Sequence, residues 1–256
     1  MDFLDFGVSN LPSTLFTYQH EPLWKPEWGT RYRTLPVTFP TSKTPLGEVI
    51  ARLPLMADGL IHLDTDPDVI DIAAYPMSIE YFWPIGMDRA VKRAHVPDIA
   101  ARRADGSVLF IDYIPVNEQE RRPDIAKRTR ILADHVAAYY SCIYVVHDEL
   151  SILAKPLFPN LQTMWKHKPT VIDPDGVRLV MQAIRRFHFP SRIADITDRL
   201  KLQAELRTVF AELEVGGVDL TFTAIMQMCF SGELDIDMSA QFSGRTVVSA
   251  RNVRGA

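Results

Sequence analysis

The stretch that decides the fold of this chain is KRAHVPDIAARRADGSVLFIDYIP, residues 92–115. It holds two apolar runs separated by Asp105-Gly106, a dipeptide typical of the turn in a β-hairpin. Asp98 stands at the head of the first run and Asp112 at the end of the second. The pattern therefore predicts a hairpin that presents two carboxylates, which are the ligands that a magnesium ion prefers in proteins.

The residues around this stretch predict an α/β domain. A helix is expected over residues 46–63, and Pro54 should kink or divide it because proline lacks the amide proton that a helix interior needs. An amphipathic helix is expected over residues 124–140, and the apolar run CIYVVH, residues 142–147, is typical of a strand buried on both faces. The other expected strands cover residues 68–76, 77–83, 98–102 and 108–114. This order predicts a mixed sheet flanked by helices.

Past Pro169 the strand pattern gives way to helical periods. These periods cover residues 176–187, 191–200, 202–217 and 221–232. Two short strand-like pieces follow around Ser243-Gly244, and short helices with a terminal hairpin are typical of a winged-helix domain. The sequence thus predicts a first domain over residues 1–168, whose first 40 residues are an irregular wrap rich in proline and aromatic residues. A mainly helical, winged-helix-like domain is expected over residues 169–256.

The composition is that of a globular protein, with 47% hydrophobic and 23% charged residues. No apolar run approaches the ~20 residues that a bilayer span needs. Asp2 and Asp5 stand where a secretory signal would carry Lys or Arg. We therefore expect a cytoplasmic protein without a membrane partner. Cys142 and Cys229 lie far apart in apolar surroundings and are expected to be buried thiols.

Basic residues cluster around the hairpin, although the formal net charge of the chain is −4. A negative total argues mildly against binding nucleic acid through bulk positive charge, although a local cluster of basic residues is able to override the total. On this evidence alone we favour the alternative that these side chains form ordinary solvated faces. The candidates for contacts with DNA are Lys92, Arg93, Arg102, Arg103, Lys127 and Arg128.

From about Thr41 onward the chain resembles the TnsA family, the endonuclease subunit of heteromeric transposases. The similar segments are LIHLDTDPDVIDIAAYP, HVPDIAARRADGSVLFIDYI, YVVHDEL, KPLFPNLQTMW and CFSGELDIDM. The resemblance implies a restriction-endonuclease-like fold of the type known as PD-(D/E)XK, followed by a helical, winged-helix-like domain. It also implies DNA and a transposase or ATPase protein as partners.

In that family a Glu on a helix and two acids on strands hold Mg²⁺ or Mn²⁺, and a Lys beside them orients the attacking water. Asp98 and Asp112 match the two strand acids. The lysine position, two residues after Asp112, holds Ile114, and the position of the helical Glu holds Met56. An isoleucine cannot stabilise an anion, and a thioether is too soft a donor for Mg²⁺. The resemblance therefore implies a degenerate nuclease site.

Neighbouring residues offer substitutes for the two lost groups. Lys127 or Arg128, on the following helix, would supply the cation, and Glu48, a turn before Met56, would supply the acid. The alternative is that Lys127 is an exposed residue of an amphipathic helix and Glu48 a residue near a helix N-terminus. We favour this alternative, because each substitution needs its own structural coincidence.

Two further groups of residues have both a functional and a plain interpretation. His95 is either a metal ligand or general base beside Asp98, or, as the resemblance implies, a residue that packs and hydrogen-bonds near the site. Asp235 and Asp237 alternate along an expected strand and are either a cation site or a solvated strand face. We favour the second interpretation in each case.

Three functions follow from these observations. The leading hypothesis is a TnsA-like protein of a transposon or other mobile element, with a degenerate nuclease site, that acts by binding DNA, a partner protein or both. The second is an active DNA endonuclease that cuts at transposon ends with Mg²⁺ or Mn²⁺ and a relocated catalytic Lys. The third is a protein-interaction subunit that does not touch DNA, and the net charge of −4 supports it.

Overall fold

The computed structural model describes residues 10–26, 36–86, 88–170, 175–207, 209–210 and 219–251. The chain forms two compact units. The first comprises Met1–Asp64 and Asp68–Ile152, and the second comprises Thr65–Pro67 and Leu153–Ala256. The division thus falls before the boundary expected at residue 168, because the helix at residues 157–166 packs on the second unit's core.

A mixed four-stranded sheet forms the centre of the first unit. Its strands are β3 (Val69–Ala74), β6 (Ile99–Arg103), β7 (Val108–Tyr113) and β8 (Ile143–His147), in the order β3-β6-β7-β8. The pairs β3/β6 and β6/β7 are antiparallel, and β7/β8 is parallel. The hairpin predicted at Asp105-Gly106 is β6–β7, and Gly106 has the positive φ of +84° that its turn requires. The expected mixed sheet is therefore confirmed.

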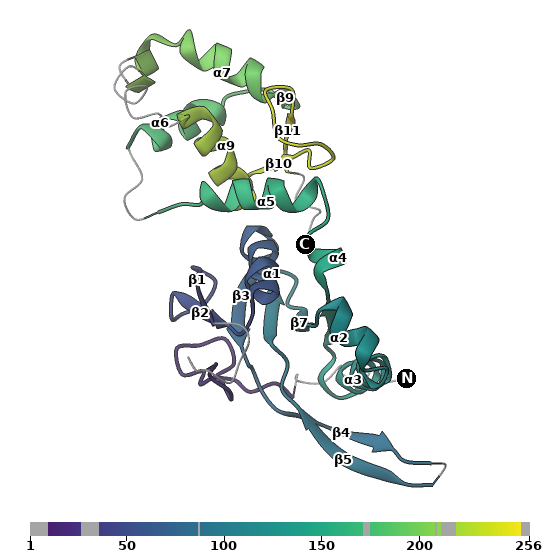
Figure 1. Cartoon of the computed structure of the whole chain (residues 1–256). Coiled ribbons are helices and arrows are strands. Elements are labelled where there is room, and N and C mark those ends of the chain that lie inside the picture. The colour runs from purple at the N-terminus through teal and green to yellow at the C-terminus, as the bar shows by residue number, and fades with distance from the viewer. Residues whose placement is uncertain are drawn as a thin grey trace, which may run out of the picture. The chain divides into compact units, whose positions relative to one another are not determined.

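Helices alternate with these strands along the chain and lie beside the sheet (Figure 1). In the first unit they are α1 (Pro54–Thr65), α2 (Val116–Arg121), α3 (Asp124–Tyr140) and α4 (Glu149–Ile152). The helix α3 joins β7 to β8, as a parallel pair requires a crossover connection. It buries Leu132 and Val136 in a core that also contains Phe110 of β7 and Tyr144 of β8.

The helix expected over residues 46–63 is wrong in its first part. Residues Glu48–Ala51 form strand β2, which pairs in antiparallel fashion with β1 (Val37–Pro40). Pro54 is the first residue of α1, where its missing amide proton costs no hydrogen bond. The β-branched pair Val49-Ile50 suits a strand better than a helix, and β1 supplies the partner.

The strand expected over residues 77–83 is present as β4 (Ile79–Pro84). It pairs with β5 (Ala90–His95), a strand that the sequence pattern did not predict, and not with the central sheet. The hairpin β4–β5 forms a sheet of its own and extends as a ribbon beyond the central sheet (Figure 1). Lys92 and Arg93 therefore belong to a strand of this ribbon.

The second unit is mainly helical and carries a small antiparallel sheet. Its helices are α5 (Leu157–Lys166), α6 (Asp175–Ile184), α7 (Ile193–Lys201), the 3₁₀ turn η1 (Ala204–Leu206) and α9 (Leu220–Phe230). Its strands are β9 (Ser191–Arg192), β10 (Leu234–Ile236) and β11 (Val247–Ala250), in the order β10-β11-β9. Half of the helix expected over residues 202–217 lies outside the described residues, and within them the turn η1 covers Ala204–Leu206.

The helix α9 is the centre of the second unit's core. Its side chains from Leu220 to Cys229 are buried, except that of Phe222, which is partly buried. The helix packs against α5, α6 and α7. Among the described helices of both units, none has the length and apolar composition that crossing a membrane requires. Both cysteines, Cys142 and Cys229, are free and buried, as expected.

Candidate functional site

Asp98 lies just before β6 and is only 5% exposed. Arg52, between β2 and α1, binds its carboxylate through two hydrogen bonds, from Nε to Oδ1 at 2.6 Å and from Nη2 to Oδ2 at 2.8 Å. The backbone amide of Tyr113 donates a third hydrogen bond to Oδ2 at 2.8 Å. Arg52 Nη2 also donates to the carbonyl oxygen of Tyr113 at 2.8 Å. Both oxygens of Asp98 are therefore held by groups of the protein itself.

Asp112, near the end of β7, is 3% exposed and has four neighbouring polar groups. Its Oδ2 accepts a hydrogen bond from the Tyr144 hydroxyl at 2.6 Å and lies 2.7 Å from His95 Nε2. Arg128 Nη2 lies 3.7 Å from the same oxygen. The backbone amide of Asp98 donates to Oδ1 at 3.2 Å. The hairpin thus brings the two acids together as expected, and joins them through the Asp98 amide.

The cations around the pair set its electrostatics. Burial raises the pKa of Asp98, although the hydrogen bonds and charge of Arg52 act against that rise. Burial acts in the same direction on Asp112, but His95, Tyr144 and Arg128 outweigh it, so the pKa of Asp112 is lowered. Burial would lower the pKa of Arg52, but the hydrogen bond and charge of Asp98 outweigh it, and this pKa is raised. Groups of this chain therefore balance the negative charge of the site.

The two positions that the resemblance assigns to the lost Glu and Lys are part of the core. Met56, on the first turn of α1, is fully buried. Its sulfur lies 3.4 Å from the Arg52 amide nitrogen and 3.6 Å from the Tyr75 hydroxyl. Ile114 is 5% exposed and follows β7 directly. Neither side chain offers a ligand for a hard divalent cation.

The cavity beside the acids has a volume of about 490 Å³. Arg52, Arg128 and His95 line it, and Trp24 and Tyr75 form an aromatic wall. The rings of Trp24 and Tyr75 meet edge to face, with their centroids 4.9 Å apart. The cavity therefore combines three basic side chains with an aromatic surface next to the carboxylates.

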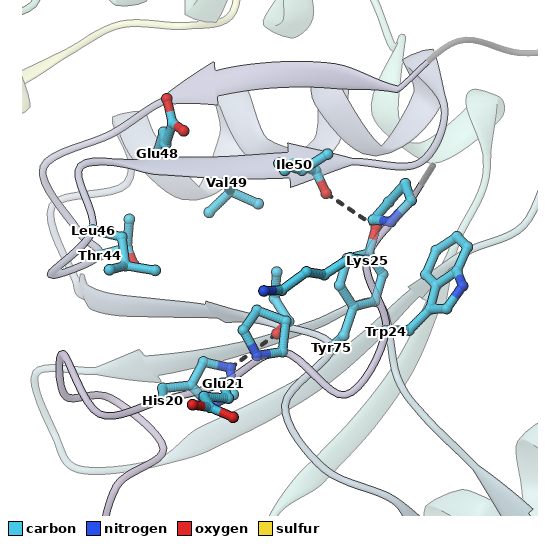
Figure 2. Close-up of a pocket in the computed structure, with 13 residues that line it drawn as sticks. His20, Glu21, Trp24, Lys25, Thr44, Leu46, Glu48, Val49, Ile50 and Tyr75 are labelled. Atoms are coloured by element: carbon cyan, nitrogen blue, oxygen red, sulfur yellow. Dashed lines mark hydrogen bonds between the residues drawn. The ribbon is translucent and has the colours of Figure 1, made fainter. Parts of the chain in front are cut away.

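Of the two possible substitutes for the lost lysine, only Arg128 reaches the site. Lys127, the neighbouring residue on α3, has its Nζ 4.8 Å from the centre of the Trp83 ring, away from the acids. Glu48 does not supply the lost acid. It is exposed on β2 and lines a separate cavity of about 520 Å³, shown in Figure 2, which Lys25 and His20 also line. The expectation that Glu48 stands near a helix N-terminus is wrong, because residues 48–51 form a strand.

The candidates for contacts with DNA are dispersed over the first unit. Lys92 Nζ pairs with Glu80 at 2.6 Å, and the Arg93 guanidinium lies over the Trp83 ring at 4.3 Å. Arg102 is paired with Asp71, through an Nε–Oδ2 hydrogen bond of 2.8 Å. The remaining candidates are Arg103, half-buried on β6, and Arg128, beside Asp112.

In the second unit, Asp235 and Asp237 are exposed. Asp237 lies just beyond β10 and accepts a hydrogen bond from the Ser239 amide at 2.9 Å. The structure thus places these two carboxylates at the surface, and the Asp237 carboxylate stabilises the turn that follows β10.

Two residues that reasoning from sequence missed are central to the site. Arg52 lies four residues before Met56, the position that the resemblance assigns to a carboxylate. An arginine so close to this position could have been recognised as a candidate partner for Asp98. Tyr144 belongs to the apolar run CIYVVH, and a tyrosine buried in such a strand needs a partner for its hydroxyl. That need, together with the parallel pairing of β7 and β8, points to Asp112.

A divalent metal does not fit these residues as they stand. Arg52 and the Tyr113 amide occupy the oxygens of Asp98, and His95 and Tyr144 occupy Oδ2 of Asp112. Within the described part of the chain, no three His, Cys, Asp or Glu side chains are grouped so that they could hold a metal ion. A metal at the acids would have to displace the Arg52 guanidinium.

No protein-family model matches the sequence, and comparison with curated proteins finds no match.

Proposed function

We propose that this protein is a TnsA-like protein with a nuclease fold that has lost its nuclease chemistry and acts in a mobile-element system by binding DNA, a partner protein or both. The observation that carries the proposal is the double hydrogen bond between Arg52 and Asp98. A guanidinium stands where the carboxylates of an active site would hold a metal ion.

The topology of both units supports this proposal. In the first unit, helix α1, strands β3, β6 and β7, helix α3 and strand β8 follow one another as a restriction-endonuclease-like domain requires. In the second unit, α6, β9, α7, α9, β10 and β11 follow the order of a winged helix, with β11 between the other two strands. Asp98 and Asp112 stand at the positions that the resemblance assigns to the retained acids.

The chemistry of Arg52 explains why hydrolysis would be lost. An active metal lowers the pKa of a bound water and exchanges ligands during the reaction. A guanidinium supplies positive charge in a fixed fork, keeps its protons at all relevant pH values and cannot activate a water in this way. Arg52 and Arg128 therefore balance the charges of Asp98 and Asp112. Neither arginine can generate a nucleophile from water.

A nicking assay on supercoiled plasmid and on transposon-end DNA tests this proposal, with Mg²⁺ or Mn²⁺ added to the full chain. We expect no cleavage above that of the Asp98→Ala, Asp112→Ala double variant. Robust cleavage by the natural chain that this double variant lacks would overturn the proposal.

Arg128 favours one alternative, the active endonuclease with a relocated cation. Its Nη2 lies 3.7 Å from Asp112, close enough to take part in the site, although the residue is an arginine rather than the expected lysine. In that case the same assay would show metal-dependent nicking that Arg128→Gln abolishes. The control variant is Lys92→Gln, since Lys92 is paired with Glu80 and should leave nicking unchanged.

A further inference from the structure

The ribbon β4–β5 is an addition that the central sheet does not need. Ala74, the last residue of β3, is paired with Ile99, the first residue of β6. Two antiparallel strands that meet in this way need a connection of only about 2–5 residues. Here the connection runs from residue 75 to 98 and contains the whole ribbon (Figure 1). A structural role in the sheet therefore does not explain it.

The ribbon is firmly anchored at its base. Ile79 and Tyr81 of β4 are buried in the first unit's core. Farther out, Trp83 is stacked with two cations, Arg93 from β5 at 4.3 Å and Lys127 from α3 at 4.8 Å. An isolated two-stranded hairpin is marginally stable in water. These contacts fix the direction in which the ribbon leaves the domain.

One face of the ribbon continues the carboxylate site. His95, whose imidazole contacts Asp112, shares this face with Arg93, because alternate residues of a strand point the same way. On α3, Lys127 stands beside Arg128, which also contacts Asp112. The cations Arg128, Lys127 and Arg93 thus form a track that starts at the site and runs onto the ribbon. No carboxylate among the described residues pairs with Arg93 or Lys127.

The opposite face of the ribbon differs in its electrostatics. Lys92, paired across the ribbon with Phe82, points to that face, and its ammonium is neutralised by Glu80 at 2.6 Å. Phe82 is 65% exposed there. Of the two cations on β5, Lys92 is thus paired with a carboxylate, whereas Arg93, on the face that continues the site, is stacked on Trp83.

We infer that the ribbon β4–β5 is an arm that binds duplex DNA, with Arg93 and Lys127 contacting backbone phosphates beside the Asp98–Asp112 site. This inference rests on the proposed function. The charge of the track is complementary to phosphate, and the major groove of B-DNA admits a two-stranded ribbon. Single-stranded DNA is bound through aromatic stacking, whereas Trp83, the aromatic residue beside the track, is already stacked with the two cations.

The test measures affinity of the full chain for a fluorescent duplex of mixed sequence, about three helical turns long, over a range of salt concentrations. The double variant Arg93→Gln, Lys127→Gln should reduce the slope of log K against log salt by about 2 and weaken binding at least roughly tenfold at low salt. Lys92→Gln is the matched control on the opposite face and should leave the slope unchanged. Substitutions at these exposed positions should not prevent folding, which hydrogen exchange of α3 will verify.

Other outcomes overturn the inference. Wild-type affinity and slope in the double variant would show that DNA binds elsewhere, and the proposed function would stand without the arm. If the natural chain self-associates and the double variant does not, while DNA binding is unchanged, the arm would be a protein-docking surface. The natural chain could bind single-stranded DNA as tightly as duplex DNA, and the double variant could lose both affinities to the same extent. That result would overturn the assignment to duplex DNA. Failure of the wild-type chain to bind any duplex at low salt would remove both the arm and the DNA-binding part of the proposed function.

Discussion

Arg52 and Asp98, 46 residues apart in the sequence, form a two-pronged ion pair with hydrogen bonds of 2.6 and 2.8 Å. Arg52 comes from the connection between β2 and α1, and Asp98 from the start of β6. In the proposed function, the Arg52 guanidinium supplies the positive charge that a metal ion supplies in an active nuclease site. Its consequences for stability, metal binding and pH dependence are measurable.

Removing Arg52 should destabilise the first unit strongly. The Arg52→Ala variant leaves the buried Asp98 without its cation, and breaking a buried ion pair by removing one partner costs about 3 kcal/mol or more. Hydrogen exchange of amides in β6 and β7 measures this loss. The control is Arg102→Ala, which removes a more exposed partner of Asp71 and should cost about 1 kcal/mol or less. Similar losses in the two variants would contradict the central role of Arg52.

Restoring the family pattern should create a metal site only if Arg52 is removed as well. The Met56→Glu, Ile114→Lys variant adds a third carboxylate, but the Arg52 guanidinium still binds Asp98. We expect the triple variant with Arg52→Ala to be unstable without metal and to gain stability with Mg²⁺ or Mn²⁺, by about 2.7 kcal/mol when the ion is at 100 times its Kd.

Thermal unfolding with and without metal measures this gain, with the natural chain as the control that should not respond. A triple variant that also fails to respond would mean that the backbone around Asp98 and Asp112 lacks the nuclease geometry. The resemblance would then be one of fold only.

Two histidines should make the first unit sensitive to mild acid. Burial lowers the pKa of His62 and of His147, so the folded state favours their neutral forms. Their contribution to stability is complete above the unfolded pKa of about 6.5 and is lost as pH falls through the lower folded values. Protection of the β8 amides should therefore fall below about pH 6.5. The His62→Gln, His147→Gln variant should show a shallower decline, and an equal decline would assign the effect to other groups.

Local patterns predicted a large part of the first unit. The turn Asp105-Gly106, the amphipathic period of α3 and the apolar run of β8 depend on neighbours in sequence, and each led to the right element. The strand β2 was mistaken for helix, although Val49-Ile50 favours a strand, because its partner β1 lies in the segment that was expected to be irregular. The ribbon was missed for a similar reason, since β4 and β3 are both strands by pattern and only tertiary pairing assigns β4 to β5.

The sequence pointed to the acids of the site and, among the alternatives, to His95 and Arg128, which both lie beside Asp112. Asp98 and Asp112 lie at the two ends of one local hairpin, so their proximity follows from its turn. Arg52 and Tyr144 reach the same carboxylates from β2–α1 and β8, and no short-range pattern joins these segments. The resemblance assigned Met56 and Ile114 to the positions of a Glu and a Lys, but it gave no sign that Arg52, rather than Lys127 or Glu48, binds Asp98.

The most direct test of the central claim is a crystal of the natural chain soaked in Mn²⁺ and measured for anomalous scattering. We predict no anomalous peak between Asp98 and Asp112, with the Arg52 guanidinium still bound to both oxygens of Asp98. A manganese ion coordinated by Asp98 and Asp112, with Arg52 displaced, would contradict the account and make the active endonuclease the leading function.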